Sequence, residues 1–450
     1  MVNVLFVAIP KATWADMGTR AATMSVINLI PLLCGPRLSM VTKLLGISLR
    51  TSLASHKWIG RTAIGLAGLH IAIIAKDGER FARTWSSISG VVASSALGLI
   101  LILSIRPVIR RVYEWFLNSH LLLAAIALLA IWRHLPTKTA AAKFLKAGIC
   151  QWAITSAVHW GLFARRNFVF GRPFATAVVT PLSDESEASQ VLQVDITAPR
   201  PWRVWAGQHV FLSIPALGIF TGLRGHPFVI AWWDHDRSGL TISILVTSKN
   251  GFTRELSRNA NKTFRAFIDG PFGIPHDFGA YGTVIMIATG IGIAGHMPYL
   301  KDLVSGYNSC EVRTRRILLV WQIQNEYHGD AVRPWIVKPW MDKILTQDTG
   351  MVSLHIPESG KEDEDLGTHS KIKVTSTPPD IEGLLQKEIG GRRGDIIVSL
   401  CADNAISDRA RTQVQTHMDK GVRLVELDFQ PSSFKTAAKD TRGMEFSCRG

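Results

Sequence analysis

Two apolar stretches in the first third of this chain each carry a pair of histidines, and the interval within each pair is the same. The pairs are His56 with His70 and His120 with His134, and both intervals are 14 residues. In an α-helix, 14 residues turn to within about 40° of four full turns and rise about 21 Å. Each pair therefore lies on nearly one helix face, at two depths of a bilayer whose apolar core is about 30 Å thick.

This arrangement suits haem iron, which neutral imidazole binds strongly as an axial ligand. Two helices that each present two imidazoles on one face would hold two haems between them, one above the other. A single histidine in a membrane helix is more often a polar group that is hydrogen-bonded to a neighbour. Because the interval is repeated, we interpret His56, His70, His120 and His134 as the axial ligands of two haem irons.

The amino-terminal part of the chain has the apolar runs of a membrane protein. Residues are 47% hydrophobic, and the long apolar runs all fall before about residue 165. The sequence predicts five membrane spans, at about residues 20–36, 44–75, 86–106, 116–134 and 144–164. One span separates the two histidine-bearing helices, so these two helices run in the same direction. His56 then shares a depth with His120, and His70 shares one with His134.

Basic residues indicate which end of the spans is cytosolic. The net charge is +15, and much of the Lys and Arg flanks the apolar runs. Three basic clusters lie at one end of the spans, over residues 37–61, 106–111 and 165–172. The positive-inside rule places these clusters in the cytosol, so His56 and His120 would hold the inner haem. The positive charge is therefore interpreted as membrane-surface charge, and nucleic acid is not expected as a partner.

From about residue 168 the pattern changes to short strands. Six strand-like runs broken by Gly and Pro predict a small antiparallel barrel. They lie at residues 174–180, 190–197, 209–215, 226–233, 240–247 and 263–269. The five cysteines of the chain are scattered and form no CxxC motif, which indicates neither a disulfide framework nor a zinc site.

After about residue 280 the strands alternate with helices, which predicts a parallel α/β sheet of the dinucleotide-binding kind. The expected strands are 283–289, 316–322, 395–401 and 422–429, and the expected helices are 294–305, 332–345 and 404–420. The charged segment 358–373 is expected to be a solvated, mobile loop. The chain is therefore expected to have three domains, at residues 1–166, 167–278 and 279–450.

The turn after the first strand of this sheet has the sequence Thr289-Gly290-Ile291-Gly292. A strand that turns sharply into a helix can bring backbone N–H groups against a diphosphate only where glycine removes the side chain. Many GxG sequences are simple tight turns. Here the turn follows a strongly apolar strand and opens a helix, so we interpret it as a dinucleotide site.

Several short motifs follow the histidine pairs along the chain: Gly207-Gln208, His226-Pro227-Phe228, Gly251-Phe252-Thr253, Asp269–Gly273 and Thr289–Gly292. In this order and spacing, the chain from about residue 20 to about residue 430 resembles the fungal ferric or cupric reductase transmembrane components, relatives of the NADPH oxidases. The resemblance implies an α-helical transmembrane haem-binding bundle. It also implies two domains after the bundle: an antiparallel β-barrel FAD domain and a Rossmann-like α/β NAD(P)-binding domain of the ferredoxin reductase type.

The resemblance also assigns cofactor-binding residues. In that family the His-Pro-Phe segment and the residue after it line the flavin, the Gly-Phe-Thr segment lies by the FAD diphosphate, and the glycine turn binds NADPH. The matching positions here are His226, Pro227, Phe228, Val229, Gly251, Phe252, Thr253, Gly290 and Gly292.

Three positions depart from the family pattern. Val229 stands where the family often has Thr or Ser, so a hydroxyl that could hydrogen-bond the flavin is lost. Cys401-Ala402-Asp403 replaces the usual Cys-Gly-Pro, although the thiol that is expected beside the nicotinamide is kept. A buried cysteine is also commonly a small apolar packing residue, and that alternative stays open for Cys401. The amino end lacks a first span and an outer domain that many members carry, so the chain is expected to be shortened or mis-started.

By resemblance, this is an oxidoreductase that passes electrons from cytosolic NADPH through FAD and two b-type haems to an external ferric or cupric chelate. Two alternatives stay open: an NADPH oxidase that reduces O₂ to superoxide, and a degenerate haem-binding membrane protein without turnover. NADPH is favoured over NADH, with Arg333 and Lys338 as candidate contacts of its extra phosphate.

The expected location is the plasma membrane, which the chain would cross several times, with the flavin and nucleotide domains in the cytosol. The resemblance also suggests partners in high-affinity iron uptake. The sequence leaves the metal, its chelate and the oligomeric state open.

Overall fold

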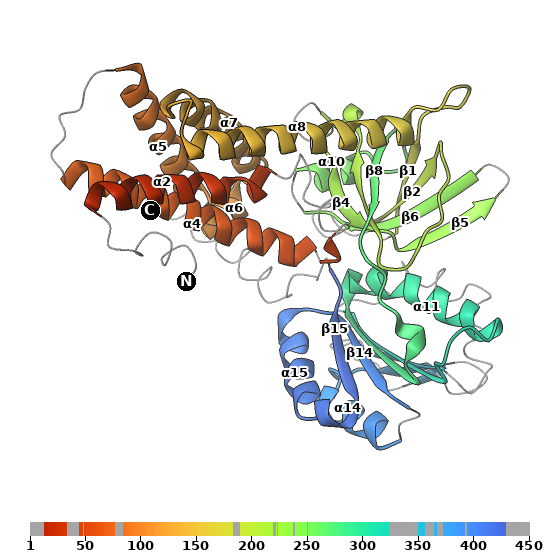
Figure 1. Ribbon diagram of the computed structural model, residues 1–450. Helices are drawn as coiled ribbons and strands as arrows, with labels where there is room; N and C mark the ends of the chain where they lie inside the picture. Colours follow the sequence, from red (N-terminus) through yellow and green to blue (C-terminus); the bar gives the residue numbers. More distant parts are fainter. Residues whose placement is uncertain are drawn as a thin grey trace, which may run out of the picture. The chain divides into compact units, whose positions relative to one another are not determined.

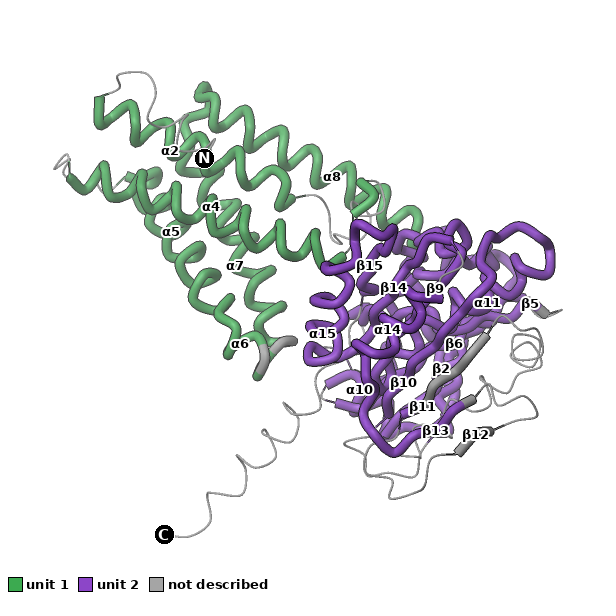
Figure 2. The backbone as a smooth tube through the Cα atoms, turned by 90° about the horizontal axis from the view of Figure 1, so that it is seen from below, with its two compact units in different colours: residues 1–164 green, residues 165–450 purple. Residues whose placement is uncertain are grey.

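The computed structural model describes residues 13–33, 45–47, 49–76, 84–182, 190–218, 222, 224–236, 239–249, 251–323, 350–355, 364–366, 372–391 and 394–428. The chain divides into two compact units, Met1–Ala164 and Arg165–Gly450, which Figure 2 shows in green and purple. Each unit is described by itself below.

Unit 1 is helical. Its long helices are α2 (Trp14–Leu29), α4 (Leu49–Lys76), α5 (Trp85–Leu103), α7 (Tyr113–His134) and α8 (Ala140–Asn167). The last three residues of α8 belong to unit 2. The short helices are η1 (Pro31–Leu33) and α6 (Arg106–Arg111). The side chains of Thr13 and Thr84 accept hydrogen bonds from backbone N–H groups of the first turns of α2 and α5, and so fix where these helices begin. Helix α2 packs along α4, and α5 packs along α7.

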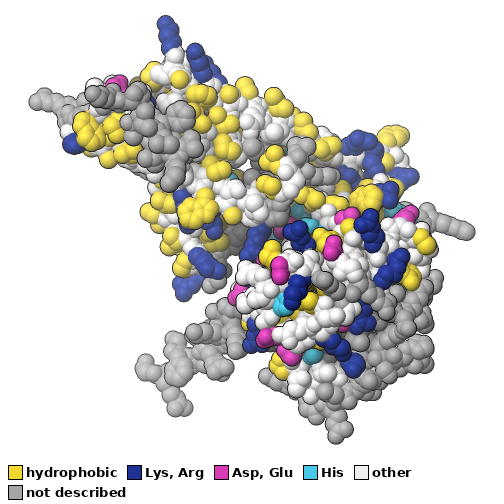
Figure 3. Space-filling view, turned by 60° about the horizontal axis from the view of Figure 1, so that its bottom comes forward, with side chains coloured by type: hydrophobic (Ala, Val, Ile, Leu, Met, Phe, Trp, Pro, Cys, Tyr) yellow, Lys and Arg dark blue, Asp and Glu magenta, His cyan; other side chains and the backbone are white. Residues whose placement is uncertain are grey.

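Three of these helices are long and apolar enough to cross a membrane: α4, α5 and residues Trp115–His134 of α7. Their surfaces carry many exposed large hydrophobic side chains, and Figure 3 shows such side chains spread over the helices. In the described part of unit 2, exposed large hydrophobic residues are confined to Phe168, Phe170, Val178, Trp205 and Met418. In water an apolar surface of this extent would be unfavourable, whereas lipid would cover it.

The other two predicted spans differ from the expectation. Helix α2 has 16 residues, which at about 1.5 Å per residue is shorter than the apolar core of a bilayer. Helix α8 has 28 residues and is long enough, but polar residues such as Gln151 and His159 interrupt its apolar sequence. Neither helix is among the described helices that combine the length and the hydropathy of a span.

Two antiparallel sheets form the barrel of unit 2. One has the strand order β5-β6-β2-β1-β7 and the other β4-β3-β8. The strands are β1 (Thr176–Pro181), β2 (Val191–Ala198), β3 (His209–Ser213), β4 (His226–Val229), β5 (Trp232–Asp236), β6 (Gly239–Thr247), β7 (Thr263–Arg265) and β8 (Phe267–Phe272). Alternate residues of the strands, such as Leu192, Val194 and Ile196 of β2, face the buried core. The expected antiparallel barrel is confirmed.

The prediction of one strand over residues 226–233 is wrong. Strand β4 ends at Val229, and β5 begins at Trp232 in the other sheet. Between them the Ile230 N–H donates to the Gln208 carbonyl and the Ala231 N–H to the Ser243 carbonyl, both over 2.9 Å. The side chains of both residues are buried, so the apolar run continues through the corner at which the chain changes sheets. Residues 263–269 are divided between β7 and β8 in the same way.

The part of unit 2 that follows the barrel is built around a mainly parallel sheet with the order β12-β13-β11-β10-β9-β14-β15. Its strands are β9 (Thr283–Thr289), β10 (Arg316–Gln322), β11 (Gly350–His355), β12 (Glu364–Leu366), β13 (Ile372–Thr375), β14 (Ile396–Cys401) and β15 (Val422–Glu426). Val284, Met286 and Ala288 of β9 face the core shared with α11 (Ile293–Asn308). The alternate residues Ile285 and Ile287 face α14 (Ile381–Gly390) and α15 (Asn404–Gln415). The parallel α/β sheet is thus confirmed, while the predicted helix 332–345 lies outside the described residues.

The prediction that residues 358–373 form a loop is partly wrong. Residues Glu364–Leu366 form β12, which pairs antiparallel with β13 (Ile372–Thr375) at the edge of the sheet. Charged residues are common on the edge strands of sheets. Val374 of β13 packs partly buried against the core, which gives this edge an apolar attachment.

Candidate functional site

The four predicted haem ligands lie as two pairs between α4 and α7. The imidazole centroids of His56 and His120 are 6.0 Å apart, and those of His70 and His134 are 6.5 Å apart. The partners are therefore those that the common direction of the two helices predicts. Along α4 the pairs are separated by 14 residues, which is about 21 Å of helix.

These distances fit two imidazoles that bind opposite sides of one metal ion. A bond from a metal ion to a histidine nitrogen is about 2 Å long, and ring bonds near 1.33 Å place each nitrogen about 1.1 Å from the ring centroid. Two such rings facing each other across an ion would have centroids about 6 Å apart. In the described part of the chain no cluster of three or more His, Cys, Asp or Glu forms a bare metal site. Haem needs only two axial ligands from the protein, so the donor set fits haem.

Backbone carbonyls orient two of the four imidazoles. His70 Nδ1 lies 2.9 Å from the Gly18 carbonyl oxygen on α2, and His134 Nδ1 lies 2.9 Å from the Ser86 carbonyl oxygen on α5. A carbonyl can only accept, so both Nδ1 atoms carry the proton, and each neutral ring keeps its lone pair on Nε2. This is the tautomer that a metal-binding histidine needs when its other nitrogen is hydrogen-bonded.

The Nδ1 atoms of His56 and His120 are buried, but neither has a hydrogen-bond partner among the described protein atoms. The ring of Phe116 packs at 5.7 Å from that of His120. The two pairs thus share their spacing but differ in how the protein fixes their rings.

The residues assigned to the flavin lie on β4 and at the start of α10 (Phe252–Arg258). The imidazole of His226 stacks on the ring of Phe252, with 4.2 Å between centroids and 10° between planes. The ring of Phe228 is tilted relative to that of Phe252, with 6.2 Å between their centroids. Gly251 precedes α10 with φ of 58°, a left-handed conformation that favours glycine. Thr253 Oγ1 accepts a hydrogen bond of 2.9 Å from the Lys249 N–H, which closes this loop.

The fold therefore brings the His-Pro-Phe-Val strand and the Gly-Phe-Thr segment together, although they are separated in sequence. Pro227 is exposed on β4, and the ring of Phe252 is buried in the barrel core. Val229 pairs with His209 of β3 and packs partly buried against the core shared with α11. Val229 contributes apolar surface at the position where a hydroxyl is common in the family.

The predicted dinucleotide turn lies between β9 and α11. Gly290 has φ of 49°, and Gly290–Gly292 form the short helix η4 that leads into α11. The indole Nε1 of Trp321 donates a buried hydrogen bond of 2.8 Å to the Gly290 carbonyl. Trp321 belongs to β10, so the sequence indicated only that it is a buried strand residue, and nothing in it indicated this contact with the turn.

The turn lies where the strand order changes direction. The chain continues from β9 to β10 on one side, whereas β14 flanks β9 on the other side. Open α/β sheets bind ligands at such a point, outside the carboxyl ends of the strands. Thr289 at the end of β9 accepts a hydrogen bond of 2.8 Å from the Asp403 N–H, which joins the two strand ends.

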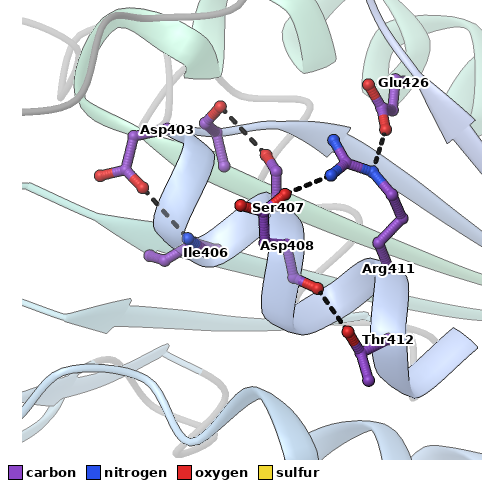
Figure 4. Close-up of polar contacts among 8 residues, drawn as sticks. Asp403, Ile406, Ser407, Asp408, Arg411, Thr412 and Glu426 are labelled. Atoms are coloured by element: carbon purple, nitrogen blue, oxygen red, sulfur yellow. Dashed lines mark hydrogen bonds and ion pairs between the residues drawn. The ribbon is translucent and has the colours of Figure 1, made fainter.

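Helix α15 begins at the same edge of the sheet. The carboxylate of Asp403 caps it by accepting a hydrogen bond from the Ile406 N–H over 3.1 Å (Figure 4). About two turns further along, Arg411 pairs with Asp408 and, over 2.6 Å, with Glu426 of β15. The cap fixes where α15 begins after Cys401, and the pair between Arg411 and Glu426 joins α15 to β15.

Cys401 is the last residue of β14, opposite Ala288 of β9, and it is buried. A Cβ atom on Gly295 of α11 would lie only 3.1 Å from its Sγ, so the thiol packs directly against the backbone of the helix. Burial raises the pKa of this thiol to about 12. A thiol that stays protonated at neutral pH is a poor nucleophile and a poor base, so its burial favours a packing role for Cys401.

A second buried group, His296 of α11, was not predicted from the sequence. Its Nε2 lies 3.1 Å from the hydroxyl of Ser399 on β14, and burial lowers its pKa to about 3. The ring is therefore neutral at physiological pH, and it adds no positive charge beneath the glycine turn. Attraction for a diphosphate at this turn would come from backbone N–H groups and the amino end of α11.

Comparison with known proteins agrees with both units. Residues 21–131 match the family described as "Ferric reductase like transmembrane component", and residues 170–276 match the family described as "FAD-binding domain". The chain is 26% identical over 446 residues to the ferric/cupric reductase transmembrane component 1 of Candida albicans, with 89% of this chain and 55% of the relative covered. It is 23% identical over 435 residues to the ferric reductase transmembrane component 5 of Saccharomyces cerevisiae, with 88% and 58% covered.

Among solved structures, a flavohemoglobin from Malassezia yamatoensis is similar with a TM-score of 0.43 and 11% identity, covering 92% of this chain and 99% of that one. The chain spans a little over half the length of these two reductase components from Candida albicans and Saccharomyces cerevisiae. The family resemblance of the sequence motifs is confirmed: this membrane protein has one region that matches the ferric reductase like transmembrane component and a second region that matches the FAD-binding domain.

Proposed function

We propose that this protein transfers electrons across a membrane, from NADPH through FAD and two b-type haems to a ferric or cupric chelate on the other side. The observation that carries the proposal is the pairing of His56 with His120 and of His70 with His134 between two apolar helices. These pairs belong to the same chain as an FAD-binding domain. The relatives named as ferric or cupric reductases support the choice of acceptor.

The proposed roles in the membrane follow from geometry. The four Nε2 atoms would bind the two haem irons, and the helices would set the distance between the haems. Arg50, Lys57 and Arg61 on the first turns of α4, with Arg106 and Arg111 of α6, support a cytosolic location for the end that carries His56 and His120. We infer that the flavin and nucleotide domains are cytosolic, that the membrane is the plasma membrane, and that the partners are those of high-affinity iron uptake.

The proposed roles in unit 2 divide between the barrel and the parallel α/β sheet. The β4 strand and the start of α10 would hold the flavin, and the turn at Gly290 and Gly292 would bind the diphosphate of NADPH. When bound, FAD supplies the change from two-electron to one-electron chemistry, and haem accepts the single electrons. The thiol of Cys401 would pack against the nicotinamide and position its ring by contact, since it is protonated at neutral pH.

A direct test uses the purified full chain. We expect absorption bands of low-spin b-type haem, and we expect NADPH to reduce them under anaerobic conditions. Adding a ferric chelate should then reoxidise the haems rapidly, and a cupric chelate tests the second acceptor. Bands that NADPH leaves oxidised would contradict the proposal in favour of a haem-binding protein without turnover. Faster reoxidation by O₂, with superoxide as product, would replace it with an oxidase.

Replacing Cys401 by alanine tests the role of the thiol. If Sγ positions the nicotinamide, the Cys401→Ala variant should reduce its flavin with NADPH several-fold more slowly in single-turnover measurements. Haem spectra and FAD content should stay unchanged, because the substitution removes one small buried atom. The matched control is Cys150→Ala, since Cys150 is an exposed residue of α8.

An unchanged rate of flavin reduction in Cys401→Ala, with normal FAD loading, would show that the thiol only packs against α11. The rate in the wild-type protein should also show no inflection due to this thiol between about pH 6 and pH 9, because its pKa is raised to about 12. An inflection that disappears in Cys401→Ala would mean that the thiol ionises during the reaction.

A further inference from the structure

The first turn of α5 meets the last residue of α7 through two hydrogen bonds between the same two residues. His134 Nδ1 donates to the Ser86 carbonyl oxygen over 2.9 Å, and the Ser86 hydroxyl donates to the His134 carbonyl oxygen over 2.9 Å. His134 ends α7, so its carbonyl has no partner within the helix, and the Ser86 hydroxyl supplies one. Side chain and backbone of His134 are thus held by one residue of a neighbouring helix.

Gly90 lies one turn further along α5 and lets the helix backbone approach the ring. A Cβ atom at this position would lie 2.9 Å from both Cε1 and Nδ1 of His134, and 3.5 Å from its Cγ. A separation below 3.0 Å requires that one of the two groups move. An imidazole with free ends could swing aside, but a ring whose Nδ1 is bonded to Ser86 and whose Nε2 binds iron is fixed at both ends.

Among the described residues, the other histidine of this pair, His70, has no glycine pressed as closely against its ring. His70 Nδ1 donates to the Gly18 carbonyl, and a Cβ atom at Gly18 would lie 3.9 Å from that nitrogen, an ordinary contact distance. The close approach at Gly90 therefore concerns His134 specifically.

We propose that Ser86 and Gly90 are positioning residues for His134, and that they orient its imidazole for iron by a carbonyl at Nδ1 and by the absence of a side chain beside the ring. This inference rests on the proposed function, because it assumes that His134 is a haem ligand. The carbonyl fixes the tautomer that leaves Nε2 unprotonated and makes that nitrogen a stronger donor. Loss of such a supporting contact typically weakens metal binding about 10–100-fold.

The test compares Gly90→Ala with Gly98→Ala in the purified full chain. Gly98 lies on the same helix, and a Cβ atom there would meet nothing within 4 Å. In Gly90→Ala we expect the affinity of one haem site to fall about tenfold or more, or its low-spin ferric electron paramagnetic resonance signal to shift. The signal of the haem between His56 and His120 should persist and shows that the bundle is folded. Gly98→Ala should retain both signals.

A second variant, Ser86→Ala, adds no bulk and removes only the hydroxyl. It should shift the signal of the same haem without loss of the other. The inference is overturned if Gly90→Ala and Ser86→Ala both keep the wild-type spectrum, or if Gly90→Ala loses both haems together. The proposed function is tested separately by His134→Ala: if that variant keeps both haems, then His134 is not a ligand, whatever the glycine variants show.

Discussion

Replacing His134 by alanine should reduce the haem content of the purified protein to about half and abolish reduction of the external acceptor. A low-spin, bis-imidazole iron needs both of its axial ligands. His70, whose ring lies 6.5 Å from that of His134, would be left as the single ligand. Since the haem at this level is the last in the proposed sequence, electrons would stop at the other one. Flavin reduction by NADPH should continue at the wild-type rate.

The same reasoning gives opposite signatures for the two levels. His70→Ala should reproduce the spectrum of His134→Ala, whereas His56→Ala and His120→Ala should each remove the other haem. Haem stoichiometry and the low-spin ferric resonance signals distinguish the two losses. A variant of the first pair that affected the signal assigned to the second would show that the pairing is wrong.

A matched control is available on α8. His159 is buried, and it belongs to neither pair. His159→Ala should therefore keep both haems and the reductase activity, although it removes a buried imidazole from a helix of unit 1. Loss of one haem in this variant would make His159 a ligand and would leave one of the four assigned residues without a role.

The histidine pairing was predictable because it depends on helix geometry alone. Fourteen residues bring two side chains to one face, and one intervening span makes the two helices parallel in direction. The pairing of His56 with His120 follows from these two facts, and the structure has the same partners. The contact of His134 with Ser86 and Gly90 was not predictable, because no periodicity records which residue of a third helix lies against a ring.

In unit 2, too, local sequence patterns predicted the elements but not the contacts between distant residues. Alternation located the buried strands, and the glycine turn marked the start of the helix after β9. The alternation pattern failed at Ile230 and Ala231, where a buried run passes from one sheet to the other without any change in composition. It also failed at residues 364–366, where charged residues pair through their backbone at a sheet edge. Buried contacts such as Trp321 with Gly290 depend on tertiary packing and left no local pattern.

Replacing Gly290 by valine should disable the nucleotide site while leaving electron transfer inside the protein intact. Gly290 has φ of 49°, which a β-branched residue adopts only under strain. Such strain costs on the order of 1–3 kcal/mol. A turn that relaxed to avoid it would move the Gly290 carbonyl away from the Trp321 Nε1, which now lies 2.8 Å away in the buried core. The backbone N–H groups at the start of α11 would then no longer be aligned toward a diphosphate.

For Gly290→Val we therefore expect kcat/KM for NADPH to fall between about tenfold and a hundredfold, since each 1.4 kcal/mol corresponds to a factor of ten. Haem content, FAD content and reduction of the haems by dithionite should be unchanged. The matched control is Gly390→Val at the end of α14, where a Cβ atom would meet nothing within 4 Å and φ is not in the left-handed region.

The direct chemical reduction is what makes this variant informative. If NADPH enters at the Gly290 turn, dithionite should bypass the defect and reduce both haems in Gly290→Val to the same extent as in the wild-type protein. A variant whose haems dithionite fails to reduce would have lost the haem arrangement, so the turn would be structural. Wild-type kcat/KM for NADPH in Gly290→Val would place the diphosphate elsewhere, because a strained or displaced turn cannot bind it unchanged.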